Sequence, residues 1–265
     1  MDIAGEDQEM MKKIAWINFV FLWAATCLFG YPPSYGPFAD GESPQKVVRK
    51  QWVVTKQQKQ PGQEAEYPSL WCFAESEGST GPTVWLRRVE HPKGDEWEIT
   101  VKDRNGTPIS EPSTNDMPSY VIYVSTADLN RDGIPDFMVQ IWSGGCGLAA
   151  EGSTTTFLLS EKGRFKSTNF YGYDIGPEDI IKLKSDGPWY YIHNDLLWNG
   201  DEKTRDGRDH SFWVYQLYRF SGGKMIEASR DDARFPKWIW YTYKANHKET
   251  DQLTAEQKKR IMEGK

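Results

Sequence analysis

The chain has few residues of the types that build metal clusters or thiol chemistry. Of its 265 residues, three are Cys and four are His, and the His residues are scattered without the spacing of a zinc site. No Lys/Arg-rich run offsets the net charge of −6, which argues against nucleic acid as a partner. A long helical pattern is also lacking after the N-terminal region. The sequence therefore offers no zinc site, no basic surface for nucleic acid and no long helix. Its informative features are strands, turns and one acidic loop.

Short apolar runs, rich in β-branched and aromatic residues, recur from about residue 47 onward. Turn signals such as Asn105-Gly106 separate them. The predicted strands are 83–90, 96–103, 119–127, 136–143, 154–160, 164–170, 188–198, 211–220, 224–229 and 237–244. Such a pattern is typical of an antiparallel all-β domain. We therefore expect antiparallel sheets, arranged either propeller-like or as a two-sheet sandwich.

Two segments carry more detailed expectations. The run SFWVYQLYRF (211–220) alternates least, which predicts a central strand that is buried on both faces. In the tail, Thr254 and Gln257 have the spacing of a capping box, with basic residues following. The tail is therefore expected to form a short, exposed helix.

The N-terminus resembles a secretory signal. Met11-Lys12-Lys13 precedes the uncharged apolar stretch IAWINFVFLWAATCLFG (14–30), which gives a basic region followed by an apolar core. The acidic residues before Met10 do not suit such a signal, so translation is expected to start at Met10 or Met11. An uncleaved membrane anchor is the alternative, since this stretch is at the lower edge of a membrane span. A lipidated Cys27 is a third option.

The N-terminal signal predicts an exported protein in the periplasm, at the cell surface or outside the cell. Its expected parts are a signal peptide or anchor (1–30), a Pro/Gly-rich linker (31–45), an all-β domain (46–245) and a polar tail (246–265). A membrane would be contacted through an uncleaved N-terminal segment alone.

Two cysteines remain once the signal region is set aside. Cys72 and Cys146 would form a natural disulfide in an exported chain. The bond would close a loop of about 75 residues, worth about 4 kcal/mol in the chain-entropy model. Two separately buried thiols are the alternative.

The stretch ADLNRDGIPDF (127–137) places oxygen-bearing side chains at regular spacing. Asp128, Asn130, Asp132 and Asp136 occupy positions 1, 3, 5 and 9 of a loop. A glycine at position 6 permits a sharp turn, which would let the carbonyl of Ile134 supply position 7. Calcium takes six to eight such oxygens. The sequence therefore predicts a calcium loop between two strands, and the alternative is an Asp/Asn/Gly turn without metal.

The stretch TADLNRDGIPDFMVQ (126–140) resembles the calcium loop of FG-GAP repeats, also called VCBS-type repeats. These repeats occur in integrin-like β-propellers and many bacterial surface proteins. The resemblance implies calcium as cofactor, with Asp128, Asn130, Asp132, the Ile134 carbonyl and Asp136 as ligands. A single good copy is present. In a second stretch, DEKTRDGRD (201–209), Lys203 takes a ligand position and breaks the spacing.

An enzymatic interpretation rests on Cys146 in the Gly-rich bend 143–147. This Cys could act as a nucleophile, with a His as base and an Asp to orient it. The candidates are His193 or His210 for the base and Asp195 or Asp209 for the orienting acid. A hydrolase that uses a pair of acids instead cannot be assigned from sequence spacing.

Aromatic side chains gather in two of the predicted strands. The candidates for an exposed binding row are Trp189, Tyr191, Trp238 and Trp240, since such rows can stack on sugar rings or grip a protein. Core packing is the alternative and the more common role. Taken together, the sequence predicts an exported calcium-binding β-domain. It would be a non-catalytic binding or envelope-associated module with an unknown protein or carbohydrate ligand, and the rival is the secreted hydrolase.

Overall fold

The structure is a computed structural model that describes residues 38, 44–58, 69–89, 96–115, 121–142, 152–173, 180–198, 203–241 and 253–263. The predicted signal region and nearly all of the predicted linker lie outside these residues. The described part holds no helix with the length and apolar character needed to cross a membrane.

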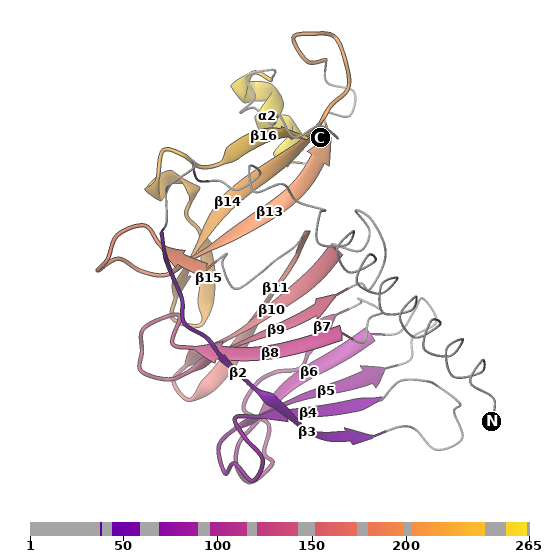
Figure 1. The fold of residues 1–265 in the computed structure, drawn as a ribbon, viewed down its shortest axis with the longest axis vertical. Coiled ribbons are helices and arrows are strands. Elements are labelled where there is room, and N and C mark those ends of the chain that lie inside the picture. Colours follow the sequence, from indigo (N-terminus) through magenta and orange to yellow (C-terminus); the bar gives the residue numbers. More distant parts are fainter. Residues whose placement is uncertain are drawn as a thin grey trace, which may run out of the picture.

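Three antiparallel sheets make up the described part, and they follow one another along the long axis of the molecule (Figure 1). From residue 53 onward they follow the order of the sequence, while two short earlier strands, β1 (Gln45–Lys46) and β2 (Lys50–Gln51), pair in the third and second sheets. The first sheet has the order β3-β4-β5-β6-β7. Its strands are β3 (Val53–Gln58), β4 (Leu70–Ala74), β5 (Thr83–Val89), β6 (Glu96–Lys102) and β7 (Ser113–Asn115). Each strand pairs antiparallel with its neighbour in the sequence.

The second sheet has the order β11-β10-β9-β8-β2. Its strands are β2 (Lys50–Gln51), β8 (Val121–Ala127), β9 (Asp136–Trp142), β10 (Gly152–Glu161) and β11 (Arg164–Tyr173). The loop that joins β8 to β9 is the acidic loop, and the ladder on either side of it closes at the pair Ala127–Asp136.

The third sheet has the order β1-β12-β13-β14-β15, and β16 also pairs with β14. Its strands are β1 (Gln45–Lys46), β12 (Ile180–Lys182), β13 (Tyr190–Trp198), β14 (Ser211–Ser221), β15 (Lys224–Glu227) and β16 (Lys237–Tyr241). A 3-10 turn, η4 (Ser229–Asp231), follows β15. β14 has partners on both sides, so the predicted central position of 211–220 is confirmed.

The second sheet is the middle layer of the fold. One of its faces gives Val139 and Ile141 to a core cluster shared with Val84 and Ile99 of the first sheet. Its other face gives Phe157 and other residues to a cluster shared with the third sheet. β9 is buried from Asp136 to Ile141 for this reason. The sheets therefore pack face to face, in a sandwich-like arrangement.

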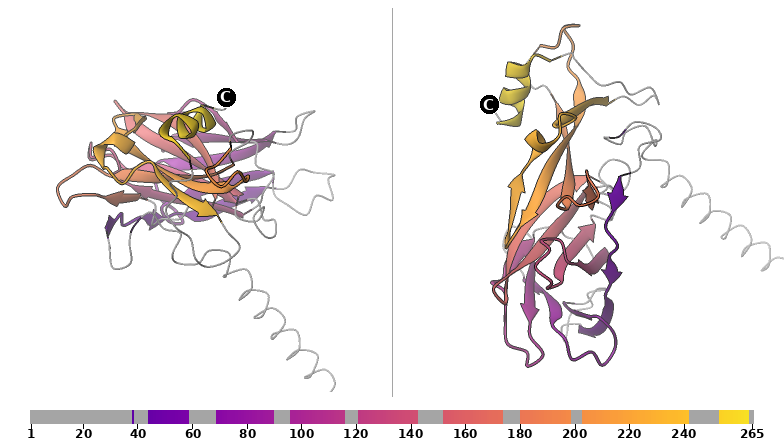
Figure 2. Two further views of the ribbon diagram at one scale, coloured as in Figure 1. Left: turned by 90° about the horizontal axis from the view of Figure 1, so that it is seen from above. Right: turned by 90° about the vertical axis from the view of Figure 1, so that its left-hand side faces the viewer.

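The short helix α2 (Ala255–Met262) lies at the far end of the third sheet (Figure 2). Its capping box forms as predicted, because Gln257 N donates to Thr254 Oγ1 and Thr254 N donates to Gln257 Oε1. No residue within α2 is buried, yet Ile261 and Met262 pack on the cluster around Trp238. The helix is exposed on most of its surface and anchored by its last turn.

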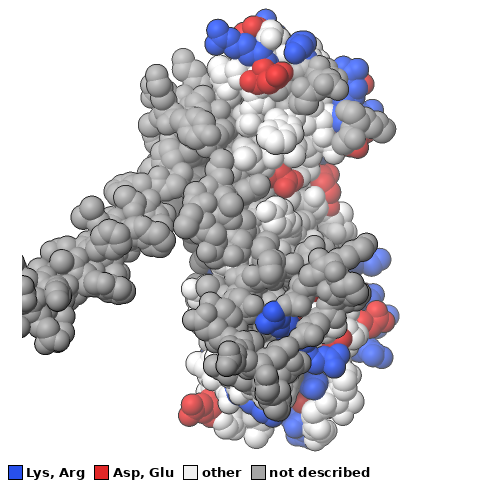
Figure 3. All heavy atoms as spheres, turned by 90° about the vertical axis from the view of Figure 1, so that its right-hand side faces the viewer, with Lys and Arg blue, Asp and Glu red and all other residues white. Residues whose placement is uncertain are grey.

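The prediction of an antiparallel all-β fold with a short C-terminal helix is confirmed, and all ten predicted strands are present. The fold has three sheets where the simplest sandwich has two. On the face shown in Figure 3, side chains of both charges lie near both ends of the molecule.

Candidate functional site

The acidic loop, residues 128–135, is shaped by its own side chains. Asp128 Oδ1 accepts from Asp132 N (3.1 Å) and Asp128 Oδ2 accepts from Gly133 N (3.1 Å). Asp132 Oδ1 accepts from Ile134 N at 2.8 Å. Gly133 has a φ of 82°, a value that a side chain would strain. The turn predicted from the glycine at position 6 is thus present.

Neighbouring elements hold the loop from outside. Arg131 has a φ of 65°, and its Nη1 donates to the carbonyls of Asp186 (3.1 Å) and Gly187 (3.3 Å) in the turn before β13. Asn130 Nδ2 donates to Ser160 O (2.9 Å) at the end of β10. The loop therefore contacts both the second and the third sheet, and these contacts restrict its conformation.

Asp136 has a role that its position in the sequence did not indicate. Its carboxylate is buried, with a residue exposure of 0%. Oδ2 accepts from Leu129 N (2.8 Å) and Asn130 N (3.1 Å), while Oδ1 accepts from Ser160 N (2.7 Å) and Ser160 Oγ (3.0 Å). A carboxylate offers about four acceptor positions, and backbone N–H groups use three of them. Ser160 Oγ also lies 2.8 Å from Asp132 Oδ2, and its single proton serves one of the two acids. Asp136 thereby ties the start of the loop to β10.

Burial raises the pKa of Asp136 to about 6, although the hydrogen bonds from Ser160, Asn130 and Leu129 act in the opposite direction. A raised pKa means that the folded chain binds this proton more tightly than the unfolded chain does. The stabilisation linked to this proton is therefore full below about pH 4 and is lost as the pH rises through about 6, while the hydrogen bonds of the carboxyl group remain.

We expect the stability of the wild type, relative to Asp136→Asn, to fall by about 2 kcal/mol between pH 4 and pH 7 when calcium is chelated. Urea denaturation across this pH range measures the difference, and the Asn variant serves as the reference that does not titrate at this position. A difference that stays constant over the range would contradict the raised pKa.

The fit of the loop to calcium is partial. Asp128 has unused acceptor positions on both carboxylate oxygens. Asp132 is more occupied, because its Oδ2 lies within hydrogen-bond distance of Asn130 Nδ2 (3.3 Å) and Ser160 Oγ (2.8 Å). Asn130 and the Ile134 carbonyl add oxygens of the type that calcium prefers. Asp136 has three acceptor positions occupied by backbone N–H groups and shares the Ser160 hydroxyl with Asp132. Among the described residues, no three or more His, Cys, Asp and Glu side chains form a group that could hold a metal.

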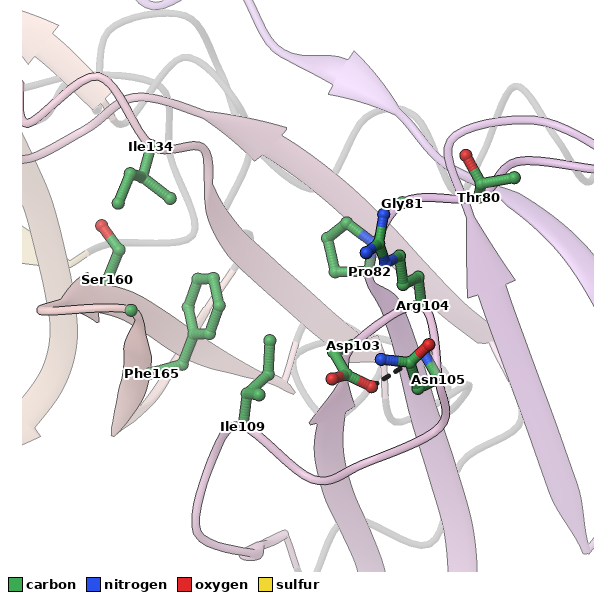
Figure 4. A pocket seen from close by; sticks show the side chains of 11 residues that line it. Thr80, Gly81, Pro82, Asp103, Arg104, Asn105, Ile109, Ile134, Ser160 and Phe165 are labelled. Atoms are coloured by element: carbon green, nitrogen blue, oxygen red, sulfur yellow. Dashed lines mark hydrogen bonds between the residues drawn. The ribbon is translucent and has the colours of Figure 1, made fainter.

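A cavity of about 520 Å³ lies beside the loop and includes Ile134 and Ser160 in its wall (Figure 4). Ser160 is the residue that sequence reasoning missed. It is 24 positions from Asp136 and belongs to no motif, so its place is known from the pairing of the strands alone.

Residues 203–209, the described part of the second stretch, are built differently from the acidic loop. Asp206 Oδ2 lies 2.9 Å from His210 Nε2, and Asp206 Oδ1 accepts from Thr204 Oγ1 at 2.6 Å. These two side-chain hydrogen bonds, that of Thr204 first, lower the pKa of Asp206 to about 2. The Asp206 carboxylate thus binds Thr204 of its own turn as well as His210, so the acid that pairs with His210 is Asp206.

Of the proposed catalytic groups, the structure brings His193 and Asp195 together. His193 Nε2 lies 3.1 Å from Asp195 Oδ2, and the histidine is 7% exposed. Its Nδ1 is buried without a hydrogen-bond partner. Cys146 lies outside the described residues. Cys72 is a buried free thiol, so the predicted disulfide between these two cysteines stays a prediction.

The four candidate binding aromatics do not form an exposed row. Tyr191 and Trp238 are buried in core clusters, at 0% and 4% exposure. Trp189 and Trp240 are half-buried, with Lys182 Nζ above the ring of Trp189 (4.5 Å). The rings of Tyr191 and Trp238 are buried by packing, because each lies on a strand face that another element covers.

Comparisons of the chain with protein-family models, with characterised proteins and with solved structures find no match.

Proposed function

We propose that this protein is an exported calcium-binding β-domain that acts as a non-catalytic binding or envelope-associated module. The observation that carries the proposal is the acidic loop. It is a glycine turn between two paired strands, with oxygen-bearing side chains at positions 1, 3 and 5 and contacts to two sheets. Asp132 is exposed, while Asp128 and Asn130 are half-buried. The resemblance to FG-GAP repeats and the apolar N-terminal stretch support calcium binding and export. The partner would be a protein or a carbohydrate.

In this proposal Asp128, Asn130, Asp132 and the Ile134 carbonyl would hold the ion. Asp136 would act from behind the loop, because its carboxylate fixes Leu129 and Asn130 through their N–H groups. Calcium would neutralise the carboxylates of Asp128 and Asp132, which repel each other without a cation. Its role would be to make the loop rigid.

Calcium should stabilise the wild type by about 2.7 kcal/mol at a hundredfold excess over the Kd, because it binds the folded loop and not the unfolded chain. Asp132→Ala should lose most of this gain, since it removes an exposed ligand and leaves Gly133 in place. Thermal melting with calcium and then with a chelator measures the effect.

Asp209→Ala is the matched control, because it removes an exposed carboxylate from another turn. It should keep the full calcium response. If the wild type and Asp132→Ala melt alike under both conditions, the loop is a turn that does not need metal, and the calcium part of the proposal fails.

A secreted hydrolase is the second candidate, favoured by the contact between His193 and Asp195. An acid that orients a histidine is part of many nucleophilic sites, and Cys146 or an acid pair would complete the chemistry. Hydrolysis of a chromogenic ester that is lost in both His193→Gln and Cys146→Ser would favour this candidate. Activity that survives His193→Gln would count against it.

A further inference from the structure

The cavity beside the acidic loop has the size of a small-molecule site. Its volume of about 520 Å³ lies within the range of about 300–1,000 Å³ that is usual for such sites. Its wall combines the edge of the second sheet with turns of the first sheet (Figure 4). Its lining includes Pro82, Asp103, Arg104, Ile109, Ile134 and Phe165.

One side of the cavity is apolar and well supported. Phe165 is 6% exposed and belongs to the core cluster between the first two sheets, against which Ile109 also packs. The two are joined through the backbone, because Phe165 N donates to Ile109 O at 2.9 Å. Ile134 extends the wall from the acidic loop and is 40% exposed. This wall offers a fixed apolar surface to a ligand.

The other side carries one cation and one acid. Asp103 Oδ1 accepts from Asn105 N (2.9 Å) and Thr107 N (2.8 Å), so the carboxylate is engaged in holding its own turn (Figure 4). Arg104 follows it and is exposed. Its side chain extends toward Gly81 and Pro82 (Figure 4). Within the described part of the chain, its guanidinium makes no ion pair or hydrogen bond. The free donors of Arg104 suit a carboxylate, sulfonate or phosphate group.

We propose that this cavity binds a small organic anion with an apolar body. The apolar part lies against Ile109, Ile134 and Phe165, and the negative group pairs with Arg104. This inference rests on the proposed role as a binding module and adds a small-molecule ligand to the protein or carbohydrate partner. It also places the ligand beside the acidic loop, because Ile134 belongs to that loop.

Two fluorescent probes with the same ring system provide the test. 8-Anilinonaphthalene-1-sulfonate carries a negative charge, and N-phenyl-1-naphthylamine is its uncharged counterpart. In low salt the wild type should bind the sulfonate about fivefold more tightly than the neutral probe, because Arg104 adds a charged contact. Arg104→Ala should abolish this difference and leave the affinity for the neutral probe unchanged.

Two further variants complete the design. Ile134→Ala should weaken both probes to a similar extent, because it removes apolar wall and no charge. Arg205→Ala, which removes an arginine from the exposed turn after Thr204, should leave both affinities as in the wild type. Thermal melting shows whether each variant is folded.

The proposal is overturned if neither probe binds, or if Arg104→Ala binds the sulfonate as tightly as the wild type does. Titrations with calcium and with chelator separate this proposal from the calcium proposal. A probe difference that depends on Arg104, in a protein whose melting ignores calcium, would support the cavity while the calcium loop fails. A calcium response without dependence on Arg104 would support the loop and overturn the cavity.

Discussion

Asp136→Ala should lower the free energy of unfolding at pH 7 by about 2–4 kcal/mol when calcium is chelated. The change removes the acceptor for the backbone N–H groups of Leu129, Asn130 and Ser160, and each buried donor left without a partner costs about 1–3 kcal/mol. Relief of the buried charge offsets part of this loss, because burial has already raised the pKa of the carboxyl group to about 6. Urea denaturation measures the net effect.

Asp132→Ala is the control for that variant, since it removes a carboxylate from an exposed position of the same loop. Without calcium it should cost less than about 1 kcal/mol. Equal losses for the two variants would show that the hydrogen bonds of Asp136 do not have the weight assigned to them.

Phe157→Ala should lower the free energy of unfolding by about 3–5 kcal/mol, the usual cost of removing a buried aromatic ring. Phe157 is fully buried in β10. Its ring packs edge-on against Tyr191 (centroids 4.9 Å apart) and Phe220 (5.4 Å) of the third sheet. The cavity left by the change lies between two sheets, so the rigid strands around it can close it only in part. Equilibrium denaturation followed by tryptophan fluorescence measures the loss.

Tyr171→Ala provides the comparison, because this ring lies on the neighbouring strand β11 and is 53% exposed. Its removal should cost less than about 1 kcal/mol. A loss of that small size for Phe157→Ala would mean that the second and third sheets do not depend on each other through this cluster.

Local pattern was enough to predict most of the strands. Runs such as 96–103 and 211–220 combine β-branched and aromatic residues with turn residues at their ends, and these are properties of neighbouring residues. Several of the strands that were not predicted have weak local patterns, although β4 (LWCFA) is apolar and was missed as well. β3 (VVTKQQ) is exposed along its whole length, and β7 has three residues. They exist because β4 and β6 offer a free edge for pairing.

For the acidic loop, too, one part could be predicted from local sequence and another part could not. Its turn could be predicted, because Asp128, Asp132 and Gly133 act on backbone groups a few residues away. The direction of Asp136 could not, since its partner Ser160 comes from another strand. From its position 9 in the loop, Asp136 was predicted to be a calcium ligand. The pairing of β9 with β10 places its carboxylate next to buried N–H groups.

By itself, then, the sequence determined the fold class, most strand positions, the capped tail helix and the turn of the acidic loop. Each of these depends on backbone preferences and on hydrogen bonds between residues close in the chain. Tertiary structure alone decided that the second sheet lies between the other two, that Tyr191 and Trp238 are core residues, and that Arg104 stands over a cavity. These features depend on contacts between segments that are distant in the sequence. The local sequence around each residue does not indicate which distant residues it contacts.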